Sequence, residues 1–79
     1  MDRKAVYKLI DEERAIQDSL GRERTDGRIH SVGDELVLEN VYLRKALEAW
    51  ANYPGDEQAL KQLIKVAAIA VRCLENHRS

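Results

Sequence analysis

Three glutamates occupy positions where the surrounding pattern is apolar. Glu13 falls inside the apolar face of the first amphipathic segment, and Glu35 and Glu39 lie one helical turn apart on the apolar face of the second. A carboxylate removed from water is costly unless something compensates its charge. Such a cluster could bind a hard cation such as Mg²⁺ together with substrate phosphates, or the side chains could reach solvent. They could also pair with arginines, for which the candidates are Arg14, Arg44 and Arg72.

A charged, glycine-containing segment, residues 21–30, leads directly into Ser31-Val32-Gly33. Its cationic and titratable members are Arg22, Arg24, Arg28 and His30. The planar guanidinium suits phosphate oxygens, and a helix N-terminus offers unpaired N–H groups to an anion. The segment therefore predicts a phosphate or pyrophosphate site, with a solvated surface loop as the alternative. It has neither the Walker spacing nor the glycine pattern of dinucleotide folds.

Other side chains that could do chemistry are few. Lys61, Lys65 and Arg72 form a stripe that is typical of the wet side of a helix, although it could extend a basic groove. Tyr42 is one of three tyrosines, any of which could stack a base, whereas Trp50 is expected in the core. The only cysteine, at position 73, lies in an apolar helical stretch and should be unreactive.

Three helices must position these residues. Apolar periodicity and end signals predict helices over about 3–20, 32–52 and 57–76, with a loop over 21–30, so the chain is all-α and residues 1–79 form one helical domain. The end signals are a capping Asp2, a terminating Gly21, the Ser31-x-x-Asp34 capping box and the turn at Pro54-Gly55-Asp56. The second and third helices should form an antiparallel hairpin.

Both hairpin helices carry more apolar surface than two short neighbours can cover. The third has one broad apolar face plus a flank, and the second is apolar on both sides of its arc. We therefore expect a homo-oligomer, most simply a dimer whose paired hairpins build a four-helix bundle. A monomeric three-helix bundle with an apolar patch is the alternative.

Composition restricts the partners. Thirteen basic and fourteen acidic side chains give a net charge of -1, so no general attraction to duplex nucleic acid or to membranes is expected. The longest apolar run, residues 66–71, is too short to span a membrane, and we expect no secretion signal. One cysteine and no zinc-type cluster fit a reducing, cytoplasmic location.

Five short sequence segments, spread over nearly the whole chain, resemble small uncharacterised phage and prophage proteins. The segments are Glu13-Arg14-Ala15-x-Gln17-Asp18, His30-Ser31-Val32-Gly33, Tyr42-Leu43-x-Lys45-Ala46-x-x-Ala49-Trp50, Gly55-Asp56-Glu57-x-Ala59-Leu60 and Lys65-Val66-Ala67-Ala68-Ile69-Ala70-Val71. This resemblance implies a bacteriophage origin and action in the cytosol of an infected bacterium.

The helical hairpin with inward carboxylates is also similar, more distantly, to the all-α nucleoside triphosphate pyrophosphatases of the MazG type. Those proteins are oligomeric bundles that bind Mg²⁺ through a Glu-x-x-Glu motif on one helix and a Glu-x-x-Asp motif on the next. Here Glu35 and Glu39 are spaced by four, and the second motif is replaced by Lys61, Lys65 and Ala68. The resemblance implies nucleotide binding with half of the metal site missing.

We therefore expect a phage accessory protein that sequesters a nucleotide-derived, phosphate-bearing ligand, such as a host defence signal, without catalysis. The expected ligand-binding residues are Arg22, Arg24, Arg28, His30, Ser31, Gly33, Glu35, Glu39 and Tyr42. One alternative is a divergent MazG-like pyrophosphatase in which Glu13, Glu35 and Glu39 hold Mg²⁺. Another is an inhibitor that docks on a host protein through the apolar flank of the third helix.

Overall fold

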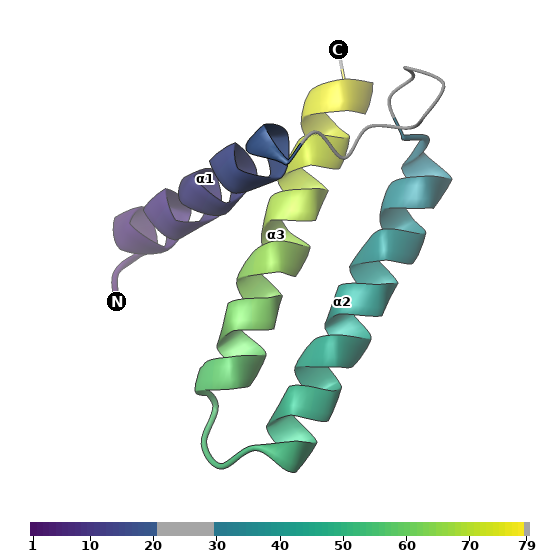
Figure 1. The fold of residues 1–79 in the computed structure, drawn as a ribbon. Helices are drawn as coiled ribbons and strands as arrows, with labels where there is room; N and C mark the ends of the chain where they lie inside the picture. The colour runs from purple at the N-terminus through teal and green to yellow at the C-terminus, as the bar shows by residue number, and fades with distance from the viewer. Residues whose placement is uncertain (21–29, 79) are drawn as a thin grey trace.

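The computed structural model describes residues 1–20 and 30–78, and every regular element in those ranges is a helix. Helix α1 spans Arg3–Ser19, α2 spans Val32–Asn52 and α3 spans Glu57–His77 (Figure 1). The expected all-α class and three helices are confirmed, with ends that agree to within one residue. The expected loop falls almost entirely outside the described residues, as does the expected stop at Gly21.

The helix ends follow from local hydrogen bonding. The Asp2 carboxylate accepts from the Ala5 N–H at 2.8 Å and opens α1. At the start of α2 the Ser31 hydroxyl accepts from the Asp34 N–H, and the Asp34 carboxylate accepts from the Ser31 N–H, each at 3.0 Å. Tyr53 is extended, as its position before a proline requires, and Gly55 turns the chain with a φ of 76°.

Helices α2 and α3 lie side by side and run in opposite directions, so the expected hairpin is confirmed (Figure 1). Helix α1 packs against α3 and does not pack against α2. Its C-terminal half meets α3, and its N-terminus points away from the hairpin (Figure 1). Helix α3 is therefore the central element, with α1 and α2 as neighbours on two of its sides.

The core within one chain is small. Among the described residues only Ala46, Ala68 and Ile69 are buried apolar side chains, and the other buried residue is Glu35. Trp50 is 64% exposed, so its expected place in the core is wrong for the single chain. Trp50 lies one turn after the buried Ala46, at the edge of the side of α2 that faces α3, and there it stays exposed.

The rotation of α3 also differs from expectation. Lys65 and Arg72, expected on a wet stripe, are partly buried and face the neighbouring helices, whereas Lys61 is exposed as expected. Leu60, Leu63 and Leu74 are about half exposed instead. The side of α3 that packs within the chain is thus the less apolar one. None of the three described helices is sufficiently long and apolar to cross a membrane.

Candidate ligand-binding cleft

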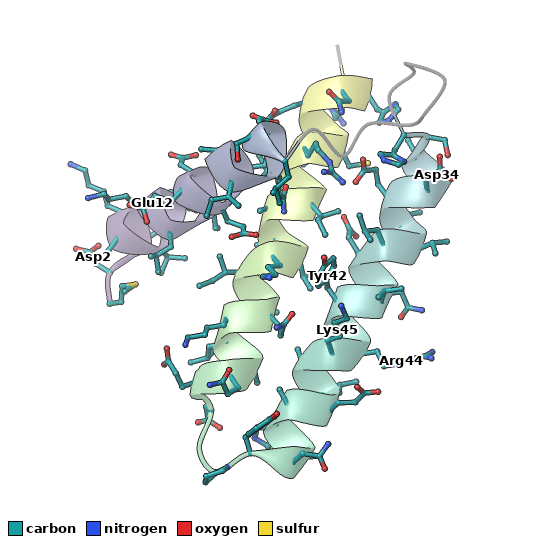
Figure 2. The ribbon with its side chains drawn as sticks, in the orientation of Figure 1. Asp2, Glu12, Asp34, Tyr42, Arg44 and Lys45 are labelled. Atoms are coloured by element: carbon teal, nitrogen blue, oxygen red, sulfur yellow. The ribbon has the colours of Figure 1, made fainter. Side chains whose placement is uncertain are left out.

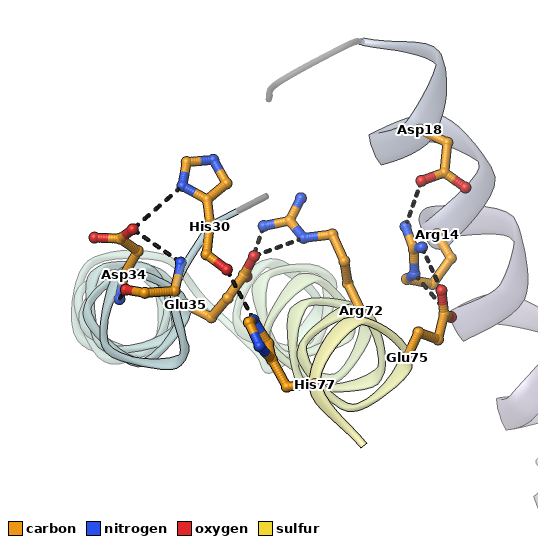
Figure 3. Close-up of polar contacts among 9 residues, drawn as sticks. Arg14, Asp18, His30, Asp34, Glu35, Arg72, Glu75 and His77 are labelled. Atoms are coloured by element: carbon orange, nitrogen blue, oxygen red, sulfur yellow. Dashed lines mark hydrogen bonds and ion pairs between the residues drawn. The ribbon is translucent and has the colours of Figure 1, made fainter. Parts of the chain in front are cut away.

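A buried ion pair joins the two hairpin helices. Arg72 donates from Nε to Glu35 Oε1 at 3.1 Å and from Nη2 to Glu35 Oε2 at 2.7 Å (Figure 3). The Glu35 side chain is only 1% exposed, and the Arg72 side chain 13%. Both carboxylate oxygens of Glu35 therefore have a cationic donor, which explains how a glutamate occupies an apolar face. Of the three candidate arginines, Arg72 is the one that the structure assigns to Glu35.

A cleft of about 510 Å³ lies beside this pair, with α3 as its floor and the facing sides of α1 and α2 as its walls. Its polar lining consists of Glu13, Gln17, His30, Tyr42, Lys65 and Arg72. Its apolar lining consists of Ile16, Leu20, Leu38 and Ile69. A concave, mostly apolar surface with a few convergent polar groups is the usual form of a small-molecule site.

Tyr42 brings an aromatic ring to this cleft, and two ammonium groups lie close to that ring, of which that of Lys65 lines the cleft. Its side chain lies between α2 and α3, with Lys45 next to it (Figure 2). Lys45 Nζ is 4.8 Å and Lys65 Nζ 5.8 Å from the centre of the ring. Both distances fall within the range of a cation–π interaction. The ring thus holds positive charge at one edge of the cleft.

Gln17 supplies an acceptor whose hydrogen bonding is incomplete. Its Oε1 atom is buried and receives no hydrogen bond from any group in the described part of the chain. A buried carbonyl oxygen without a donor costs about 1–3 kcal/mol. Because Gln17 lines the cleft, a donor on a bound molecule would remove this cost.

The N-terminus of α2 has fewer free N–H donors for an anion than the sequence indicates. Ser31 and Asp34 satisfy two N–H groups of this terminus between themselves, and the Asp34 carboxylate adds a negative charge there. Gly33 is not required by packing, because a Cβ at this position would meet only Ser31 Oγ at 3.7 Å. The three expected arginines, Arg22, Arg24 and Arg28, lie outside the described residues.

His30 lines the cleft just before the start of α2 and makes contacts with Asp34 and His77. Its Nδ1 is 3.9 Å from the Asp34 carboxylate, and its carbonyl oxygen accepts from His77 Nε2 at 2.8 Å (Figure 3). The second contact joins the end of α3 to the start of α2. It fixes the position of a residue that the sequence placed in the loop.

A second bidentate ion pair joins α1 to α3. Arg14 donates from Nε to Glu75 Oε1 at 3.2 Å and from Nη2 to Glu75 Oε2 at 2.7 Å, and its Nη1 contacts Asp18 at 2.9 Å (Figure 3). The hydrogen bond from Arg14 lowers the pKa of Glu75, and in turn Glu75 raises the pKa of Arg14. This cluster sets the position of α1, and so of Glu13 and Gln17 in the cleft wall.

The three glutamates that would hold Mg²⁺ in the pyrophosphatase alternative are not brought together into a metal site. Glu13 and Glu39 are partly buried on different helices, and Glu35 is bound by Arg72. Within residues 1–20 and 30–78 no group of three or more histidine, cysteine, aspartate or glutamate side chains could hold a metal ion. Cys73 is partly buried, and its desolvation raises the pKa of the thiol, with the negative charges of Glu35 and Glu39 adding to the effect.

Sequence reasoning missed three residues of the cleft. For Lys65 and Arg72 the sequence favours a solvated stripe over a basic groove, and it gives Gln17 no role. A signal was present for Arg72, because a glutamate in an apolar arc requires a cation and Arg72 was among the candidates. No pattern in the sequence marks Gln17.

Comparison with protein-family models, with curated proteins and with solved structures gives no match to this chain. The resemblances to phage proteins and to MazG-type pyrophosphatases therefore stay predictions.

Proposed function

We propose that the protein is a non-catalytic binding protein that holds a small phosphate-bearing, nucleotide-derived ligand in the cleft. The observation that carries this proposal is the meeting of Lys65, the Tyr42 ring and the unsatisfied Gln17 oxygen around one concave surface. These groups match the three parts of a nucleotide: an anionic phosphate, a planar base and exocyclic or sugar donors.

The charges of the cleft favour phosphate near Lys65. Arg72 is neutralised by Glu35, so Lys65 is the cation of the lining that has no ion pair with a described carboxylate. Lys45, on the same tyrosine ring, adds a second positive charge nearby. An ammonium group binds phosphate as a point charge, and in a partly desolvated cleft its attraction exceeds that of a surface lysine.

The remaining lining suits a base and a sugar. The Tyr42 ring and the side chains of Leu38 and Ile69 provide apolar surface against which a planar ring can stack, and base–aromatic stacking contributes about 1–3 kcal/mol. Gln17 Oε1 would accept from an amino or hydroxyl group, and Glu13 could accept from sugar hydroxyls. This assignment moves the hydroxyl contact from Glu35 to Glu13, because both oxygens of Glu35 are engaged by Arg72.

The same geometry supports binding over catalysis. A Mg²⁺-dependent pyrophosphatase needs carboxylates that converge on the metal, and Glu35 is instead committed to Arg72. We further propose that the protein works as a homo-oligomer in the cytosol of an infected bacterium, where it sequesters a host signal. The support for the phage setting is the sequence resemblance alone.

Calorimetric titration with nucleoside mono- and diphosphates and with inorganic phosphate tests the proposal. Lys65→Gln should weaken binding of the phosphorylated compounds by about tenfold or more, since a hydrogen bond to a charged group contributes about 1.5–3 kcal/mol. Lys61→Gln, on the same helix but exposed and outside the cleft, is the matched control and should bind normally. Equal affinity of the Lys65→Gln variant, or no binding of any phosphorylated compound by the wild type, would refute the proposal.

Incubation with nucleoside triphosphates and Mg²⁺ separates binding from the enzymatic alternative. The proposal predicts no turnover. Release of pyrophosphate that disappears in Glu39→Gln would instead establish the pyrophosphatase.

A further inference from the structure

The side of α3 that faces away from the cleft is an unbroken apolar stripe. It consists of Leu60, Leu63, Ala67, Ala70 and Leu74, spaced alternately by three and four residues. This spacing keeps side chains on one line along a helix and is the pattern of a seam between packed helices. All three leucines are about half exposed. No charged residue lies on this line, since Lys61, Lys65 and Arg72 project from other sides of the helix.

Helix α2 carries a matching exposed stripe. Its members are Leu36, Leu43, Leu47 and Trp50, and each is more than two-fifths exposed in the single chain. They follow the spacing of one helix face. This face adjoins the side of α2 that packs on α3, where Glu35 and Ala46 are buried.

Both stripes lie on the same side of the hairpin. Successive residues of a helix are rotated by about 100° around its axis. Around α2, in the direction in which the chain winds, the stripe follows the α3-facing side after roughly a quarter turn. Around α3, the stripe follows the α2-facing side in the same direction of winding. Because the two helices are antiparallel (Figure 1), equal senses of rotation bring the stripes to one common face. The cleft floor, with Lys65 and Ile69, lies on the opposite side of α3.

The area that this chain leaves exposed is larger than the average for a folded monomer of its mass. The chain exposes 6155 Å² at a mass of 9.0 kDa, whereas a folded monomer of this mass exposes about 4,850 Å². The excess of about 1,300 Å² is larger than the roughly 800 Å² that each partner buries in a standard interface. The apolar hairpin face supplies the surface that such an interface would cover.

We infer that this hairpin face is the contact surface for a second copy of the chain, which forms a four-helix bundle with the clefts on its outer sides. A second copy presents a face of the same length and apolar character, and two uncharged α3 stripes meet without repulsion. The interface gives a location to the self-association included in the proposed function. It does not depend on the ligand.

Light scattering coupled to size exclusion tests this inference on the full chain. The wild type should have twice the single-chain mass, and Leu47→Glu or Leu63→Glu should raise the dimer dissociation constant on the order of 100-fold by placing carboxylates in an apolar contact. Val37→Glu is the matched control, because Val37 is 66% exposed, like Leu47 at 62%, but lies on the side of α2 that faces away from α3 and outside the stripe. It should remain dimeric.

The fluorescence of Trp50, the only tryptophan, provides a second measurement. Its emission should move to longer wavelength on dilution, and Leu63→Glu should show the dissociated spectrum at all concentrations while retaining helical circular dichroism. A wild type that stays monomeric at micromolar concentrations, or a Leu47→Glu variant that remains as dimeric as Val37→Glu, would overturn the inference. Since the cleft lies on the other face, Leu47→Glu should still bind nucleoside phosphates, which separates failure of the interface from failure of the ligand site.

Discussion

Arg72 on α3 and Glu35 on α2 form a two-point ion pair inside the hairpin, and the same guanidinium borders the cleft. The pair has two consequences. It determines which side of α3 faces α2, because Glu35 is buried and requires a cation. It also turns the leucine stripe of α3 outward, so that the position of the cleft and the position of the apolar face have one common cause.

The buried pair predicts a strongly non-additive pattern of stability. Arg72→Met leaves the Glu35 carboxylate buried without its partner and should lower the free energy of unfolding by about 3–5 kcal/mol. The double variant Glu35→Leu/Arg72→Met removes both charges and should recover most of that loss. Urea denaturation at a fixed protein concentration measures both. A double variant as unstable as Arg72→Met would show that the two residues do not act as a pair.

The capping box at the start of α2 predicts a moderate effect of a single hydroxyl. Ser31→Ala removes the acceptor of the Asp34 N–H and should cost about 1 kcal/mol, seen as a lower midpoint of thermal unfolding. Ser19→Ala is a suitable control, since the Ser19 hydroxyl only donates to the Ile16 carbonyl at the end of α1. If the two variants unfold at the same temperature, the capping box does not stabilise α2.

The Arg14–Glu75 pair predicts a pH dependence in the acid range. The pKa of Glu75 is lower in the folded chain than its ordinary value, so folding favours the ionised form. The stabilisation is therefore fully present above the ordinary glutamate pKa of about 4.3 and is lost as the pH falls through the lower folded value. Since Glu75 is half exposed, the expected size is about 1 kcal/mol or less.

Glu75→Gln should accordingly reduce the loss of stability between neutral and acidic pH. Stability against pH, measured for this variant beside Glu12→Gln as an exposed control, checks the prediction. An acid-range profile of Glu75→Gln that matches wild type would contradict it.

Cys73 can report on the charges around the hairpin. Its raised pKa, caused first by desolvation and then by Glu35 and Glu39, predicts slower alkylation by iodoacetamide at pH 8 than that of a solvent-exposed thiol. Glu39→Gln removes one of the negative charges and should lower the pKa of Cys73 and speed the reaction. Glu48→Gln, an exposed change on the same helix, should leave the rate unchanged. An alkylation rate that is unchanged in Glu39→Gln would mean that the charge of Glu39 does not affect the pKa of the Cys73 thiol.

Local signals in the sequence were sufficient for the helices and for their hairpin. Asp2, the Ser31–Asp34 box and Pro54 act within a few residues, and the structure places helix ends beside each of them. Such signals depend on backbone hydrogen bonding alone, which is why they could be recognised without knowledge of the packing.

The rotation of the helices could not be predicted in the same way. Helix α3 has one broad apolar face, so periodicity alone predicts that this face meets α2 and cannot show that the opposite side does. The Glu35–Arg72 pair decides it, and that contact joins residues far apart in the sequence. For this reason Lys65 and Gln17 were missed as cleft residues, and Trp50 was wrongly expected in the core.

Native mass spectrometry of the freshly purified wild-type protein, before and after addition of nucleoside phosphates, tests the central claim most directly. We expect a particle of two chains that carries, or takes up, one phosphate-bearing small molecule per cleft. Single chains of 9.0 kDa that retain none of the added compounds at millimolar concentration would contradict it.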